Sequence, residues 1–463
     1  MKPVYQKIID AVPDYQQFLT LEEHDASSRA LAAEFPDVVE LSEIGTTTEG
    51  RPLLCLKIGE GPAALMLGCP HPNEPIGAMM LEHFSRALAE DEAFRRELGY
   101  TWYIVKAWDA DSLAANLWLK GPYTISNYTR GFFRPAGTEM VEWTFPIDYK
   151  TLHFHAVMPE TQAVMDLIDA TQPLFIYSLH NSGFGGVYWY QSRKTPEIWE
   201  EMRQIVADQG LPLHMGEPEM PYLEPWAPAL FRSCGVVDEY DYYEQYGPEG
   251  VDPADQCMAG ACSEEYAASR YGTFEFVNEM PYFYDERIRD TAPTDRTRRD
   301  VVLEALDANE AGTTFILDVL SATRPYMGDD NRFVRFVEAF NQAGATEAPR
   351  AMALANPAFE ALATGAEVFD NLLVTRFYKL LQFAMLLRAH EFEIAKLDEA
   401  GEGASDARVA LEAGRDRALA RYEELRDYLE EAIDYQAIPI KKLVTVQLAC
   451  GLLEADYVRT HRP

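Results

Sequence analysis

The segment that decides the fold of the first part of this chain is Ala63-Ala64-Leu65-Met66-Leu67-Gly68-Cys69-Pro70-His71-Pro72-Asn73-Glu74. It opens with a short apolar run, which is typical of a strand buried on both faces of a sheet. Apolar residues at helical spacing follow over residues 78–89. His71 and Glu74 therefore lie between a strand and a helix, at the carboxyl end of the strand, where open α/β sheets bind their ligands.

Strand-like and helix-like segments alternate over about the first 320 residues. The strand-like segments are apolar or alternating runs near turn residues: 40–44, 53–58, 63–67, 101–108 and 174–179. The helix-like segments between them are 27–34, 78–90 and 161–170. This alternation predicts an α/β fold, a three-layer sandwich with a mixed, largely parallel central sheet flanked by helices.

The pattern changes to helix from about residue 330, with long helical patterns at 331–342, 371–397 and 405–435. We therefore divide the chain into an α/β domain over residues 1–329 and an α-helical C-terminal region over residues 330–463. We expect these helices to pack on the α/β domain or on a partner subunit, in which case the protein would be a homo-oligomer.

Composition limits the classes of partner. The 463 residues are 48% hydrophobic, and 40 Lys plus Arg against 75 Asp plus Glu give a net charge of −35. This charge argues against nucleic acid and anionic membranes as partners. No stretch approaches the about 18 apolar residues of a membrane span, and no export signal is visible. The six cysteines form no Cys-x-x-Cys pair, so we expect reduced thiols in a cytoplasmic protein.

The spacing of His71 and Glu74 is not unique in this chain. His214 and His390 are each followed three residues later by a glutamate. His390 lies in a helical pattern, where such a pair is typical of a solvated helix face, and His214 lies in a turn-rich stretch, which indicates a surface loop. Only His71 lies between a strand and a helix, so this pair is the candidate for metal binding.

His180 is the candidate for a third metal ligand. It follows the apolar run 174–179, and the glycine-rich segment 181–186 after it lets the backbone approach a ligand closely. A catalytic zinc takes three protein ligands from His, Glu and Asp and keeps a further position open. His71, Glu74 and His180 are therefore predicted to hold one Zn²⁺ per chain.

Glu275 is the candidate for a general base. It lies in a strand-like segment between Phe274 and Phe276, where a charge is costly unless it is paired or faces a polar cavity. A glutamate beside the metal would take a proton from a water whose pKa the metal lowers to about 7, and would pass it to the leaving amine. Glu279, nearer the end of the strand, is the alternative.

These segments together resemble the carboxypeptidase A-type zinc metallopeptidases. Four segments carry the resemblance, in order: 43–59 to the family's opening strands, 68–77 to its paired zinc-ligand motif, 178–181 to its third ligand, and 273–276 to the strand of its general base. The resemblance implies an α/β/α sandwich, one zinc ion and hydrolysis of a C-terminal peptide bond.

The resemblance also implies arginines that bind the terminal carboxylate of the substrate and polarise the scissile carbonyl. The family's Asp-x-Asn-Arg-Asn block is not present in that form; the segment 127–134 lies in the corresponding region. The planar guanidinium of arginine suits a carboxylate. We therefore assign Arg130 to catalysis, and Arg134 with Asn127 to substrate binding.

The resemblance therefore leads to a zinc hydrolase that cleaves a peptide bond, at the C-terminus of a peptide, and the cysteine usage leads us to expect it in the cytoplasm. The altered arginine block keeps a second hypothesis open, an amidase or deacylase that acts on a small N-acyl or side-chain amide derivative of an amino acid. A third hypothesis, from another class, is a non-catalytic binding protein of the same fold. The expected partner is a peptide or a small amide, with neither nucleic acid nor membrane involved.

Overall fold

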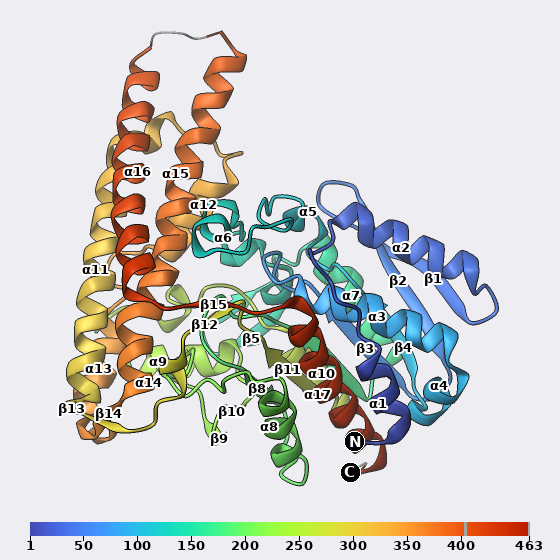
Figure 1. Cartoon of the computed structure of the whole chain (residues 1–463). Coiled ribbons are helices and arrows are strands. Elements are labelled where there is room, and N and C mark those ends of the chain that lie inside the picture. The colour runs from blue at the N-terminus through green and yellow to red at the C-terminus, as the bar shows by residue number, and fades with distance from the viewer. Residues whose placement is uncertain (402–404, 462–463) are drawn as a thin grey trace.

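Strand β3 (Ala63–Gly68) lies inside a large mixed sheet in the computed structural model, which describes residues 1–401 and 405–461 (Figure 1). Within those residues the sheet has nine strands, in the order β1-β2-β4-β3-β7-β11-β8-β10-β9. The central strands β4, β3, β7 and β11 are parallel to one another, and antiparallel pairings lie on both sides of them. The predicted α/β class with a mixed sheet and a parallel centre is confirmed.

The other strands of this sheet are β1 (Val39–Thr46), β2 (Pro52–Gly59), β4 (Thr101–Val105), β7 (Phe175–Leu179), β8 (Tyr188–Gln191), β9 (Pro225–Ala227), β10 (Leu230–Arg232) and β11 (Phe274–Glu279). Three small antiparallel pairs lie outside it: β5 (Ile147–Tyr149) with β6 (Leu152–Phe154), β12 (Phe283–Tyr284) with β15 (Gln436–Ala437), and β13 (Pro293–Thr297) with β14 (Leu362–Thr364).

Two hydrophobic cores lie on the two faces of the sheet, because successive side chains of a strand point to opposite faces. In β3, Ala64 and Met66 belong to one core, whereas Leu65 and Leu67 belong to the other. The helices on the first face are α1 (Pro3–Asp10), α2 (Leu21–Glu34), α3 (Ile76–Glu90), α4 (Glu92–Leu98), α8 (Trp199–Asp208) and α17 (Ile440–Thr460). Those on the second face are α7 (Pro159–Thr171) and α10 (Ser263–Tyr271). The result is the expected three-layer sandwich.

A helical bundle projects from this sandwich (Figure 1). Its long helices α11 (Arg298–Thr323), α15 (Thr375–Glu399) and α16 (Asp406–Ala432) lie side by side. Shorter helices accompany them: α12 (Arg332–Phe340), α13 (Glu347–Ala355) and α14 (Gly365–Phe369). The bundle begins before residue 330, and α17 packs on β7, β11 and α3 inside the sandwich. A helical sequence pattern does not show which element the apolar face of the helix packs against. We therefore placed α17 with the other C-terminal helices.

The bundle is attached to the sandwich by hydrogen bonds to backbone carbonyls. Arg388 of α15 is 9% exposed and donates to the carbonyl oxygens of Gly131, Phe132 and Ala115. Gly131 ends the short helix α6 (Ile125–Gly131), so these bonds fasten α15 to the loops beside the sheet. The C-terminal helices therefore pack on the α/β domain.

The two other His-x-x-Glu pairs lie in structural positions. His214 lies in a loop, as expected, with its Nε2 2.8 Å from the carbonyl oxygen of Glu217. The expectation of a solvated face at His390 was wrong: its side chain is fully buried between α15 and α16, with Nδ1 2.8 Å from the Leu386 carbonyl oxygen and Nε2 3.1 Å from Thr323 Oγ1. The packing of α16 against α15 covers this face.

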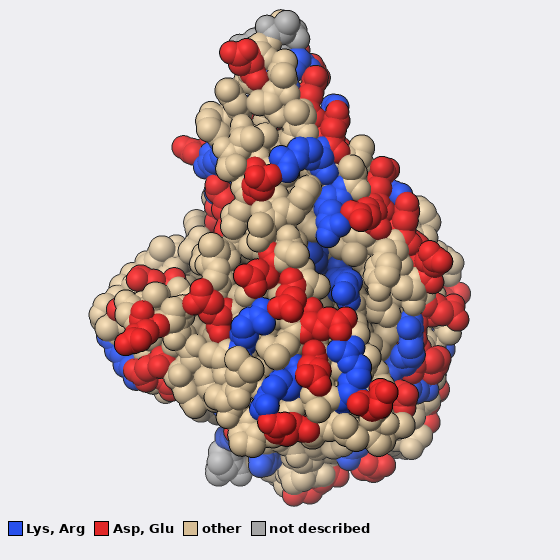
Figure 2. Space-filling model, turned by 90° about the vertical axis from the view of Figure 1, so that its left-hand side faces the viewer, with Lys and Arg blue, Asp and Glu red and all other residues tan. Residues whose placement is uncertain are grey.

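Acidic and basic side chains are interspersed over the face of the molecule shown in Figure 2. This face has no broad basic surface of the kind that nucleic acid requires. Among the described helices, none is both long enough and apolar enough to cross a membrane.

Replacing Arg388 with Met should lower the midpoint of thermal unfolding by about 3 °C or more, because buried carbonyl oxygens would lose their donors. Differential scanning fluorimetry would measure this. Arg417→Met is the matched control, since Arg417 is exposed and contacts only side chains, in an ion pair with Asp318 and over the ring of Phe315. Equal midpoints for the two variants would contradict the anchoring role of Arg388.

Candidate metal centre

His71 and Glu74 lie on the loop that joins β3 to α3. The Nδ1 atom of His71 is 3.1 Å from Oε1 of Glu74, and both side chains are buried. The helix that follows approaches the end of β7 closely, because residue 77 is a glycine: a Cβ atom there would lie 2.3 Å from Cβ of Leu179. This close packing brings Glu74 next to the residue that follows Leu179.

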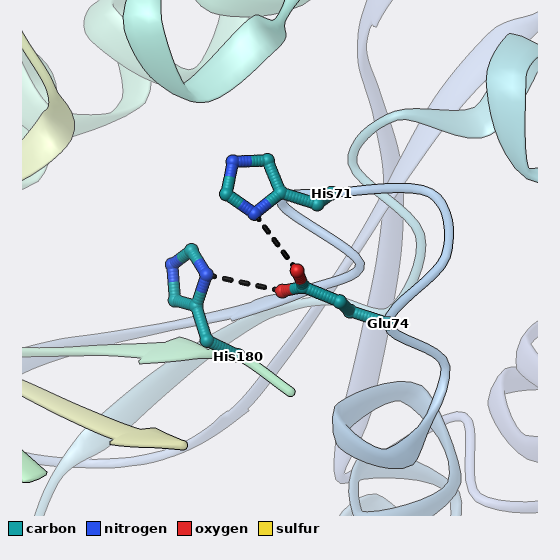
Figure 3. A group of neighbouring side chains, drawn as sticks. All are labelled: His71, Glu74 and His180. Atoms are coloured by element: carbon teal, nitrogen blue, oxygen red, sulfur yellow. Dashed lines mark hydrogen bonds and ion pairs between the residues drawn. The ribbon is translucent and has the colours of Figure 1, made fainter. Parts of the chain in front are cut away.

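That residue is His180, at the carboxyl end of β7. Because β3 and β7 are parallel neighbours, with Gly68 paired to Leu179, the two loops emerge at the same edge of the sheet. Nδ1 of His180 is 3.1 Å from Oε2 of Glu74. Each oxygen of the Glu74 carboxylate thus faces one imidazole ring (Figure 3).

The three residues fit a zinc ion. One ligand atom from each of His71, Glu74 and His180 lies within 4.8 Å of the others, and this is the one such group of His, Cys, Asp and Glu among the described residues. Tetrahedral zinc with bonds of about 2.0–2.2 Å separates its ligand atoms by about 3.3–3.6 Å, close to the two 3.1 Å separations observed. The second nitrogen of His180 lies 3.0 Å from Ser178 Oγ, which fixes the orientation of the ring.

The protonation states of His71 and Glu74 suit a metal site, whereas a metal ion bound at His180 would have to displace a proton. Burial, aided by Arg134, lowers the pKa of His71 to about 3, so this ring is neutral near pH 7. Burial alone would lower the pKa of His180, but the hydrogen bond and charge of Glu74 raise it to about 10. Burial opposes the ionisation of Glu74, whereas His71 and Arg134 lower its pKa and keep it a carboxylate.

Arg134 lies beside the metal site. Its Nη2 donates to Oε1 of Glu74 at 2.8 Å, and its guanidinium lies 6.0 Å from the ring centroid of Trp143. Arg134 therefore brings a positive charge next to the metal ligands, on a side chain that is 22% exposed.

The structure does not bring Arg130 and Asn127 to this site. Arg130 forms an ion pair of 3.0 Å with Glu391 of α15, and Asn127 donates to the carbonyl oxygen of Pro122 at 2.9 Å. Both belong to α6, which lies against the helical bundle, whereas the chain beyond Gly131 turns toward the metal site. The catalytic role assigned to Arg130 and the binding role assigned to Asn127 have no support in this geometry.

Glu275 and Glu279 share one face of β11 but lie at different depths. Glu275 pairs in register with Ile176, and its Oε1 is 3.1 Å from Ser263 Oγ. Four residues further, about 13 Å along a strand, Glu279 reaches the edge where His180 lies, with Oε1 3.9 Å from Nδ1 of His180. The carboxyl group nearest the metal ligands is therefore that of Glu279, the alternative, and not that of Glu275.

A cavity of about 170 Å³ opens beside the metal site. Its lining residues are His71, Glu142, Trp143, His180, Tyr190, Glu219, Met220, Tyr222, Cys234, Gly235, Val236, Glu239, Met258, Ala259, Gly260, Cys262, Glu264, Glu265, Val277 and Glu279. Most of them come from the acidic, tyrosine-rich part of the chain between residues 212 and 265. No local sequence pattern singles out these individual side chains within the segment.

Comparison with known proteins supports the metal centre. Residues 25–111 match the family model described as zinc carboxypeptidase, a range that includes His71 and Glu74. No curated protein matches the chain.

Several solved structures are similar at low identity. Carboxypeptidase A from Helicoverpa armigera is 16% identical, covering 60% of this chain and 71% of that one, with a TM-score of 0.37. A metallo-carboxypeptidase from Burkholderia cenocepacia is 18% identical, covering 59% and 62%, with a TM-score of 0.31. Bovine thrombin-activatable fibrinolysis inhibitor, in complex with tick carboxypeptidase inhibitor, is 14% identical, covering 56% and 86%, with a TM-score of 0.33. At such distances these likenesses carry no information on substrate.

The purified protein should contain about one zinc ion per chain, measured by inductively coupled plasma mass spectrometry. His180→Ala should bind zinc at least about tenfold more weakly in competition with a chromophoric chelator, because it loses one of three ligands. His214→Ala is the matched control, since His214 has the same sequence spacing to a glutamate but lies elsewhere. Loss of zinc from the control variant with retention in His180→Ala would contradict the site.

Proposed function

We propose that this protein is a hydrolase that cleaves a peptide bond, at the C-terminus of a peptide. The proposal starts from the zinc carboxypeptidase-type metal centre at the edge of the α/β sheet. The observation that carries the proposal is the convergence of His71, Glu74 and His180 with a fourth buried group, Glu279, beside a cavity. Water is added across the C–N bond, and a carboxylate and an amine are released.

His71, Glu74 and His180 would hold the zinc ion, which when bound would supply a Lewis acid for the scissile carbonyl and for water. Glu279 acts as the general base and then as the acid that protonates the leaving amine. Burial and the nearby charge of Glu219 raise the pKa of Glu279, whereas His180 and Arg134 oppose this rise. A raised pKa suits a group that must both accept and return a proton near neutral pH.

Arg134 is the side chain assigned to the oxygen atoms of the substrate. Its Nη2 is held by Glu74, while its buried Nε has no hydrogen-bond partner among the described residues. An N–H group fixed in this way beside the metal ligands can donate to a carbonyl or carboxylate oxygen without reorganisation. This role replaces the catalytic role predicted for Arg130.

A second candidate function is that of an amidase or deacylase, which hydrolyses a small N-acyl or side-chain amide derivative of an amino acid. One observation favours it: none of the described residues that line the cavity is a lysine or an arginine. A site built for C-terminal residues needs cations for the terminal carboxylate, and Arg134 alone would have to serve both the carbonyl and the carboxylate.

Glu279→Gln should retain zinc but lose about 10²–10⁴-fold in kcat, because the amide cannot carry the proton. The assay would use the best substrate from a mass-spectrometric screen of peptides and N-acyl amino acids. Glu275→Gln is the matched control on the same face of β11, and it should lose much less. A larger loss in the control would return the role of base to Glu275.

Cleavage of a peptide with a free C-terminus should exceed cleavage of the same peptide with a C-terminal amide at least about tenfold in kcat/KM, because the amidated peptide lacks the carboxylate that Arg134 would bind. Liquid chromatography of the products measures both rates. Equal rates, or faster cleavage of the amidated peptide, would transfer the assignment to the second candidate function.

A further inference from the structure

The cavity beside the metal centre has a strongly one-sided charge. Six glutamates line it, namely Glu142, Glu219, Glu239, Glu264, Glu265 and Glu279. Within residues 1–401 and 405–461, none of the six forms an ion pair with a lysine or an arginine; only Glu279 approaches a cationic group, that of His180 at 3.9 Å. Unpaired charges in a partly dehydrated cavity are costly, so these carboxyl groups either take up protons or pair with a positive group from outside the chain.

Two of the six glutamates have structural roles. Glu265 accepts hydrogen bonds from the backbone N–H groups of Val236, Val237 and Cys262, and so caps helix α9 (Val236–Tyr246). Glu219 is exposed at the cavity and accepts from the hydroxyl groups of two tyrosines of β8. These contacts account for their positions without a ligand.

Glu142 and Glu264 are not accounted for in this way. Glu142 is 3% exposed; its Oε1 accepts from Ser263 Oγ at 2.7 Å, but its buried Oε2 has no hydrogen-bond partner among the described residues. Glu264 has one described side-chain contact, from the thiol of Cys262 at 3.8 Å. Two carboxyl groups that line the same cavity thus have free oxygen atoms in it.

The missing partner is not a second metal ion of the kind held by the first site. Among the described residues, the only group of three His, Cys, Asp or Glu side chains with ligand atoms within 4.8 Å is the one already assigned to zinc. The volume of about 170 Å³ is instead about ten times what a single water needs. The cavity therefore has room for a group of several atoms.

The walls suit an organic cation. Trp143, Tyr190 and Tyr222 contribute aromatic rings to the lining, and Met220 and Met258 contribute flexible apolar side chains. Aromatic faces attract ammonium and guanidinium groups, and methionines adapt to an alkyl chain. Burial raises the pKa of Glu142 to about 6, and burial together with Glu142 raises that of Glu264 to about 8, shifts that a bound cation would reverse.

We propose that this cavity, which we call the glutamate pocket, binds a positively charged amine or guanidinium group of the substrate through Glu142 and Glu264. The preferred substrate of the hydrolase then carries a basic side chain or a basic amine next to the scissile bond. This inference rests on the proposed hydrolase function, because it assigns the pocket to the same substrate.

The first test compares three substrates that share the acyl group and differ in the leaving amino acid: N-benzoylglycyl-arginine, N-benzoylglycyl-leucine and N-benzoylglycyl-glutamate. For the zinc-loaded protein, kcat/KM for the arginine compound should exceed that for the leucine compound at least about tenfold, and the glutamate compound should be the poorest. An equal or greater rate for the leucine or glutamate compound would overturn the proposal and leave the hydrolase function standing.

Single-charge variants then locate the effect. In Glu264→Gln and Glu142→Gln, the arginine-to-leucine ratio of kcat/KM should fall at least about fivefold, mainly through KM. Glu60→Gln removes the same charge from an exposed residue far from the cavity lining and should keep the ratio of the unchanged protein. An unchanged ratio in both pocket variants would contradict the assignment to Glu142 and Glu264.

A binding measurement is independent of turnover. Isothermal titration calorimetry of zinc-loaded Glu279→Gln with agmatine should show binding that weakens at least about fivefold when Glu264→Gln is added. Valerate, an anion of similar length, should not bind. Agmatine binding without hydrolysis of any compound would support the pocket while removing the proposed function, and the absence of agmatine binding would remove the pocket.

Discussion

The carboxylate of Glu74 is the point on which the site depends. It is buried and accepts or shares hydrogen bonds with His71, His180, Arg134 and the backbone N–H of Asn181. These partners come from three segments that are far apart in the sequence. A buried carboxylate is stable only with such a complete set of partners, so the group that would bind the metal also holds the surrounding loops together.

The helical bundle supports these loops from outside. Tyr378 of α15 accepts a hydrogen bond from the backbone N–H of Gly183, three residues after His180. The ring of Phe377 stacks on Tyr128 at 6.0 Å, and Tyr128 in turn lies within 3.5 Å of the side chain of Asn73 in the metal motif. The bundle therefore contacts both of the loops that carry the metal ligands. In this way the C-terminal helices help to position the site.

The sequence predicted the α/β class and the three metal ligands because each depends on a local pattern. His71 and His180 each follow a short apolar strand, and parallel neighbours end at one edge of the sheet. The choice between Glu275 and Glu279 could not be made in the same way. A period of two places both on one face of β11, and only the register with β7 shows which of them reaches the level of His180.

The arginines and the glutamate pocket show a second limit of sequence patterns. Arg130 and Arg134 are four residues apart, but α6 ends between them, so the two side chains contact different neighbours. Glu142 and Glu264 are more than a hundred residues apart in the chain and meet only through tertiary packing. Local patterns carry no information on such pairs. The residues that we propose to bind the substrate could therefore be identified only in the structure.

Helix α17 has a consequence for how the chain folds. It packs on β7 and α3, and the carbonyl of its Gln447 accepts a hydrogen bond from the hydroxyl of Tyr177, 270 positions earlier. The first core of the sandwich stays uncovered on this side until the whole bundle has been synthesised. Such long-range closure slows folding and exposes apolar strands in the meantime. The nascent chain therefore exposes the apolar face of β7 and α3 until residues 440–460 have been synthesised.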